Sequence, residues 1–115
     1  MKRFLKSFLY AIRGIRFGVI DQPNLKIMIG VSLLVIIAGF YFRITSVEWC
    51  VLLLCIGLVV GLEMLNTAIE SLVDLVTRER LPLAGRIKDI AAGAVMFVST
   101  IAVIIGAIIF RKHIM

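Results

Sequence analysis

The chain has 115 residues, of which 62% are hydrophobic and only 17% are charged. A composition this apolar excludes a soluble globular domain of this length. The 13 lysines and arginines outnumber the seven acids and give a net charge of +6. The sequence therefore predicts an integral membrane protein whose basic residues set its orientation.

The first 20 residues predict an amphipathic helix that lies in the membrane surface. Apolar and basic side chains gather on different sides of the predicted helix; the apolar ones are Phe4, Leu5, Phe8, Ile12 and Ile15, and the basic ones are Arg3, Lys6, Arg13 and Arg16. A basic face of this kind binds anionic lipid headgroups or another anion, or only anchors the chain. Because the charges are scattered through the apolar residues, the segment is not typical of a signal peptide. Asp21 and Pro23 are expected to cap and begin the next helix.

Three apolar stretches are each long enough to cross a hydrocarbon core about 30 Å thick. They cover residues 25–42, 47–76 and 90–110, so the predicted fold is all-α, with a surface helix over residues 1–20 and three transmembrane helices. Nine of the 13 lysines and arginines lie before the first stretch or between the second and third, and a tenth, Lys26, lies at the start of the first. The positive-inside rule therefore predicts a multi-pass protein of the cytoplasmic membrane, with its N-terminus in the cytoplasm and its C-terminus outside.

The second stretch carries a polar stripe of Glu63, Asn66, Glu70 and Asp74. Their offsets place all four side chains within an arc of roughly 80° on a helix. If Trp49 marks the outer interface, Glu63 lies about 21 Å inward and Asp74 about 37 Å inward. The stripe would then join the region of a lipid hydroxyl to the water boundary. In these positions a buried carboxylate such as Glu63 can act as a base, and a carboxylate at the boundary, where Glu70 would lie, can hold Mg²⁺.

Two other interpretations of the stripe remain open. The carboxylates could pair with basic residues of neighbouring helices and hold an oligomer together, or they could line a cation path in a small oligomeric transporter or channel. A transporter predicts carboxylates through the full membrane depth, whereas these crowd the half nearer the cytoplasm. Gly57-x-x-x-Gly61, just outside the stripe, is typical of helix packing.

The segment from Thr77 to Asp89 is rich in basic residues and faces the same side as the acids. It can supply cations to a bound polyphosphate. Lys88 falls at the start of the third stretch, where the N-terminal amides of a helix would lie nearby. Cytoplasmic loops also carry basic residues for topology alone, so the anion site is one of two interpretations.

Two spaced motifs together resemble the family of small bacterial membrane lipid kinases that includes diacylglycerol kinase and undecaprenol kinase. The motifs are Glu63-x-x-Asn66-Thr-Ala-Ile-Glu70-x-x-x-Asp74 and Ala84-Gly85-x-x-Lys88-Asp89-x-Ala-Ala-Gly-Ala. The resemblance covers nearly the whole chain and implies a single lipid kinase domain over residues 1–115. It further implies a homotrimer with shared active sites, MgATP as phosphoryl donor, a membrane lipid alcohol as acceptor, and no nucleic-acid partner. The family has no P-loop, and this chain has none either.

The resemblance also implies roles for individual residues. Glu63 would accept the proton of the lipid hydroxyl, Asn66 would orient the γ-phosphate or that hydroxyl, and Glu70 would bind both metal and ATP. Five further residues match nucleotide-contacting positions of the family: Arg3, Tyr10, Glu79, Lys88 and Asp89. Within that set, Lys88 would be the cation that meets the phosphates.

One position departs from the family pattern. Gln22 stands where the family usually has a second glutamate as metal ligand. Because an amide oxygen binds Mg²⁺ more weakly than a carboxylate, the metal would be held more loosely, or Asp21 would take over. The stretch from Ala91 to Ala94 is more similar to the Gram-positive-type undecaprenol kinases, since the enterobacterial diacylglycerol kinases carry serine at the position of Ala92. The sequence therefore favours undecaprenol over diacylglycerol as the lipid.

Overall fold

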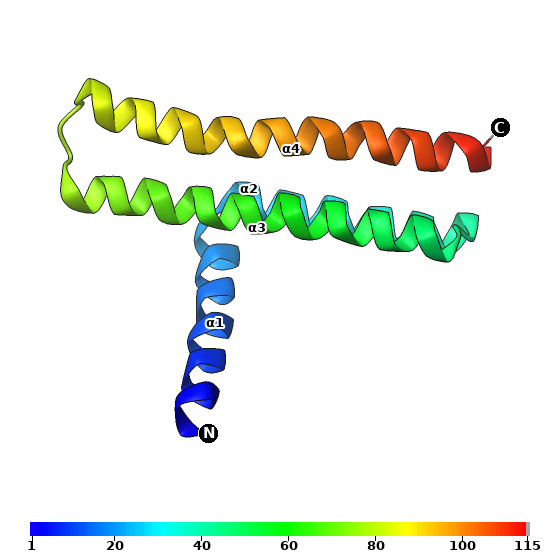
Figure 1. Cartoon of the computed structure of the whole chain (residues 1–115), viewed down its shortest axis with the longest axis horizontal. Helices are drawn as coiled ribbons and strands as arrows, with labels where there is room; N and C mark the ends of the chain where they lie inside the picture. Colours follow the sequence, from blue (N-terminus) through cyan, green and yellow to red (C-terminus); the bar gives the residue numbers. More distant parts are fainter. Residues whose placement is uncertain (115) are drawn as a thin grey trace.

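The computed structural model describes residues 1–114, and within that range it is built of helices and short connections (Figure 1). The helices are α1 (Lys2–Asp21), α2 (Pro23–Phe42), α3 (Ser46–Val76) and α4 (Pro82–Ile114). Figure 1 shows α3 and α4 as a long antiparallel pair with α2 alongside α3, while α1 projects away at a steep angle. By length and composition α2, α3 and α4 can each cross a membrane. The predicted all-α class with three apolar helices is confirmed.

A sharp elbow at Gln22 separates α1 from α2. Gln22 has extended backbone angles, and Pro23 follows at the first turn of α2, where its missing N–H leaves no hydrogen bond unmade. Gln22 is therefore the capping residue, whereas Asp21 ends α1, which corrects the expectation that Asp21 caps α2. Leu25 is 1% exposed and fits against Gly18, where an added Cβ would come within 3.0 Å of the leucine. This contact fixes α1 against α2.

The turn between α2 and α3 is closed by specific backbone and side-chain interactions. Arg43 adopts the left-handed conformation, with φ 52° and ψ 56°, and ends α2. Thr45 and Glu48 then form a capping box: the Glu48 carboxylate accepts from the Thr45 N–H at 2.9 Å, and the Thr45 hydroxyl accepts from the Glu48 N–H at 3.2 Å. Trp49 packs so closely on Gly39 that a Cβ there would lie 2.7 Å from the indole.

The C-terminal end of α4 is tied to the same turn. His113 Nε2 lies 3.0 Å from Glu48 Oε1, and Lys112 Nζ lies 3.2 Å from Glu48 Oε2. A small buried cluster supports this end of the bundle; its members are Ile44, Leu52 and Ile109. Glu48, on α3, thus contacts both the turn, through Thr45, and the end of α4, through Lys112 and His113. These contacts fix the register of α4 against α3.

The helix α4 begins earlier than the apolar stretch from residue 90. Pro82 opens it, in the position that suits a residue without an N–H. Lys88 therefore lies inside α4 and not beside its N-terminal amides as predicted, so any cationic role must come from its own side chain.

Most of the large apolar side chains on the three long helices are exposed in a single chain. The buried apolar residues are Leu25, Ile44, Leu52, Ala91, Val95 and Ile109. So small a core leaves a wide apolar surface, which a bilayer or further copies of the chain must cover.

Candidate functional site

Burial along the polar stripe of α3 falls steadily from Glu63 to Asp74. Glu63 and Asn66 are 5% and 8% exposed, Glu70 is half-buried, and Asp74 is exposed. Polar side chains are seldom this buried without a purpose, because removing them from water is costly. The stripe therefore runs from a shielded carboxylate to an accessible one along one face of α3.

Asn66 and Glu70 interact one helical turn apart. Asn66 Nδ2 donates to Glu70 Oε1 at 3.3 Å, whereas Asn66 Oδ1 is buried and has no hydrogen-bond partner. Mg²⁺ is bound by oxygen ligands of this kind, so the unpartnered amide oxygen and the adjacent carboxylate fit a magnesium ion. Within residues 1–114 no three histidine, cysteine or acidic side chains come together as a full metal site. Further oxygens would have to come from phosphates, water or another copy.

A second cluster lies where α3 ends and α4 begins. Lys88 Nζ is 2.5 Å from Asp74 Oδ1, so the predicted phosphate cation is paired with the last acid of the stripe. Both residues line a cavity of about 400 Å³, together with the connecting segment that includes Arg78, Glu79 and Arg80. We call it the loop cavity. Glu79 donates its N–H to the Thr77 hydroxyl at 3.1 Å. Asp89 follows Lys88 on α4 and is exposed.

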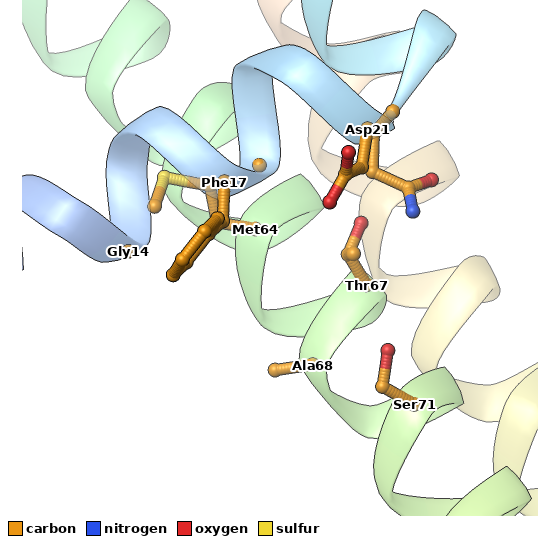
Figure 2. A pocket seen from close by; sticks show the side chains of 9 residues that line it. Gly14, Phe17, Asp21, Met64, Thr67, Ala68 and Ser71 are labelled. Carbon is orange, nitrogen blue, oxygen red and sulfur yellow. The ribbon is translucent and has the colours of Figure 1, made fainter.

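A third cluster lies where the elbow between α1 and α2 faces α3. Asp21 and Gln22 line a cavity of about 230 Å³ with Thr67 and Ser71. Figure 2 shows the two hydroxyls of α3 directed towards the side on which Asp21 lies, with Phe17 and Met64 forming an apolar wall. Gln22 lies against the face of α3 that carries Thr67 and Ser71, whereas Glu70 does not line this cavity, so one chain does not bring the two predicted metal ligands into the same cavity.

Two residues predicted to contact the nucleotide lie in the N-terminal half of α1, away from the elbow. Arg3 and Tyr10 are exposed, and the Tyr10 ring lies 5.8 Å from the Arg13 guanidinium. The N-terminal end of α1 projects away from the start of α4 (Figure 1), and α1 packs on α2 and α3 only. A single chain therefore does not bring Arg3 and Tyr10 to Lys88 and Asp89.

The structure adds residues that sequence reasoning did not place in a site. Thr67 and Ser71 are four apart on α3, and their hydroxyls face the elbow cavity. Their spacing of four residues, which puts both hydroxyls on one side of a helix next to the acidic stripe, could have predicted from the sequence that they share a site. The pairing of Asp74 with Lys88 had no such signal, since it depends on how the connection between α3 and α4 folds back.

Comparisons with known proteins identify the family and several relatives of this chain. Residues 9–110 match the family described as prokaryotic diacylglycerol kinase. The undecaprenol kinase of Bacillus subtilis (strain 168) is 43% identical over 96% of this chain and 89% of that protein. The diacylglycerol kinase of Synechocystis sp. is 40% identical over 89% of this chain and 59% of that protein. The diacylglycerol kinase of Escherichia coli (strain K12) is 29% identical over 96% of this chain and 91% of that protein.

The chain belongs to the prokaryotic diacylglycerol kinase family, as its two motifs predicted. It is accordingly a multi-pass membrane protein and a lipid kinase, a phosphotransferase that uses a nucleotide donor and acts on an alcohol group. The transporter or channel alternative gains no support from these comparisons.

Proposed function

We propose that this protein is an ATP- and Mg²⁺-dependent undecaprenol kinase of the cytoplasmic membrane, with diacylglycerol as the alternative acceptor. The observation that carries the proposal is the stripe on α3, which leads from buried Glu63 to the exposed pair of Asp74 and Lys88 beside a cavity. A lipid alcohol and a water-soluble nucleotide must meet across such a boundary. The likeness to the Bacillus undecaprenol kinase supports the choice of lipid.

Proton transfer is the task assigned to Glu63. Its burial shields the carboxylate from water, so a lipid hydroxyl that reaches it would be its proton donor. Asn66, one turn away and also buried, is placed to orient the hydroxyl or the γ-phosphate. Phosphoryl transfer depends mainly on positioning and charge neutralisation, so few groups are needed.

The metal and the nucleotide are assigned to the wetter half of the stripe. Glu70 would hold Mg²⁺, with Gln22 or Asp21 as the second protein ligand, and the ion would neutralise charge on the phosphates. Lys88 would meet the phosphates as a cation. Arg3, Tyr10, Glu79 and Asp89 complete the proposed nucleotide contacts.

The surface placement of α1 is supported by its composition and its direction. No residue of α1 is buried, and the helix leaves the bundle at a steep angle (Figure 1). With basic and apolar sides, it would lie in the interface with its N-terminus in the cytoplasm, which leaves the C-terminus outside. The residue ranges 1–20, 25–42, 47–76 and 90–110 then describe one surface segment and three membrane segments of a single domain.

A homotrimer with shared active sites would unite the clusters that one chain keeps apart. Arg3 and Tyr10 need a neighbouring copy to reach Lys88. Gly57 and Gly61 have open space beside them, and small residues let membrane helices approach closely. The exposed apolar surface of α3 around Leu54 would be covered by this packing.

The proposal is tested by phosphoryl transfer. Purified protein in phospholipid vesicles would be given Mg²⁺ and ATP carrying a radiolabelled γ-phosphate, with undecaprenol, with diacylglycerol, or with no added lipid. We expect label in the undecaprenol extract that depends on both protein and Mg²⁺. Label in neither lipid, with the trimer folded, would reject the kinase assignment.

A further inference from the structure

Lys88 is the only proposed phosphate-binding cation whose ammonium is joined to a carboxylate among the ion pairs of residues 1–114. Its partner Asp74 sits near the end of α3, and the 2.5 Å contact spans the connection to α4. Both side chains line the cavity of about 400 Å³ in which Arg78, Glu79 and Arg80 also take part. Asp74 therefore sets where the Lys88 ammonium stands in that cavity.

The pair is poorly suited to stabilise the fold. The side chains of Lys88 and Asp74 are 37% and 57% exposed, and ion pairs this accessible add little to stability because water screens them. The helices α3 and α4 already pack along their length and are joined by a short connection. The geometry of the pair is better suited to holding the Lys88 ammonium in place than to stabilising the fold.

A lysine needs such a partner more than an arginine does. Its ammonium is a point charge on a flexible stem with three donors and no fixed fork. One donor directed to Asp74 leaves two for phosphate oxygens. The carboxylate thus removes much of the freedom of the stem before the nucleotide arrives, which lowers the cost of placing the cation correctly.

We propose that Asp74 is a positioning residue that holds the Lys88 ammonium in the loop cavity, where it meets the phosphates of the nucleotide that leaves when the terminal group is transferred. The inference rests on the proposed nucleotide site. Asp74 does not itself touch the nucleotide, since its carboxylate is paired with the Lys88 ammonium and would repel the phosphates that the ammonium attracts. It acts through Lys88, and its removal changes how well the cation meets the charge that develops on the leaving nucleotide.

Asp74→Asn is the first variant, because the amide keeps the size of the side chain and removes the charge that orders Lys88. The freed ammonium is still attracted to phosphate, so KM for ATP stays the same or falls. Its geometry in the transition state is lost, so kcat falls about tenfold. Asp74→Glu, which keeps the charge on a longer stem, recovers part of kcat.

A double-mutant cycle separates positioning from folding. Steady-state kinetics with ATP would compare Asp74→Asn, Lys88→Ala and the double variant, with Arg86→Ala as the matched control. Arg86 is an exposed cation on the same helix and does not line the loop cavity. Titration of a non-hydrolysable ATP analogue by calorimetry would give the fraction of competent sites. We expect Asp74→Asn to lower kcat less than twofold further once Lys88 is already alanine.

The outcomes distinguish this inference from the site on which it rests. If Lys88→Ala matches Arg86→Ala in kcat, KM and analogue binding, the nucleotide site is not at Lys88, and both proposals fall. If Lys88→Ala impairs turnover while Asp74→Asn does not, or if Asp74→Asn costs as much in the Lys88→Ala background as alone, the positioning role is overturned and the nucleotide site stands.

Discussion

Replacing Glu63 with glutamine removes the proposed base and almost nothing else. Glutamine has nearly the same volume, so the closely packed site on α3 remains filled. Glu63 makes no ion pair within residues 1–114, so the exchange breaks no such contact. Neutralising a carboxylate that is 5% exposed also removes a desolvation penalty. The variant should fold and assemble like the wild type.

The expected loss of rate follows from the isolation of this carboxylate. A positioned general base contributes about 10² to 10⁴ in rate, or roughly 3 to 5 kcal/mol of barrier. Glu70 is the nearest acid of the stripe, but it lies about 10 Å further along the helix axis. It cannot replace Glu63 without moving the lipid by two helical turns. We therefore expect kcat to fall at least about 100-fold.

The assay is turnover at saturating ATP, Mg²⁺ and lipid, with analogue binding measured on the same samples. Glu48→Gln is the matched control, because Glu48 is also a buried acid of α3 but lies at the far end of the helix. It should keep its turnover at temperatures where it remains folded. If Glu63→Gln retains more than half of the wild-type kcat in a folded assembly, Glu63 is not the base.

Three further predictions address the metal, the nucleotide and the fold. Gln22→Glu should lower the Mg²⁺ concentration for half-maximal activity, since a carboxylate binds the ion more strongly, and Asp21→Ala should raise it if Asp21 serves as a ligand; two titrations that overlay the wild-type curve would refute this metal site. Asp89→Asn should weaken ATP binding about tenfold through a lost charge-assisted hydrogen bond, with a smaller effect on kcat than Lys88→Ala, and unchanged calorimetric binding would contradict it. Glu48→Gln should lower the midpoint of thermal unfolding, because it loses the attraction to Lys112 and His113 while its amide oxygen can still accept from the Thr45 N–H; an unchanged midpoint would show that this contact does not hold α4.

The polar stripe was predictable because helical periodicity alone fixes which side chains share a face. Glu63, Asn66, Glu70 and Asp74 required only an offset count and the assumption of a helix. The depth of these residues in the membrane stays a prediction, since it follows residue number along the helix and not the burial of side chains within one chain. The structure adds that neighbouring helices bury Glu63 and leave Asp74 exposed.

Helix ends and contacts between helices were harder to predict. Apolar content placed the third stretch at residue 90, whereas α4 begins at Pro82, because a helix can start in polar sequence when a proline opens it. The role of Glu48 as a shared partner for the turn and for Lys112 and His113 needs tertiary structure, since His113 lies 65 positions after Glu48 in the chain. The elbow cavity likewise depends on the angle at Gln22.

The most direct measurement is a competition between the two acceptors. Undecaprenol and diacylglycerol at equal mole fraction in one bilayer, with labelled ATP and Mg²⁺, give the ratio of their kcat/KM values from the two products. We predict that most of the label enters undecaprenyl phosphate, and that Glu63→Gln lowers the rate of labelling of both lipids at least about 100-fold. Label found mainly in phosphorylated diacylglycerol would contradict the assigned lipid, and a Glu63→Gln variant that keeps more than half of the wild-type rate of labelling would contradict the mechanism.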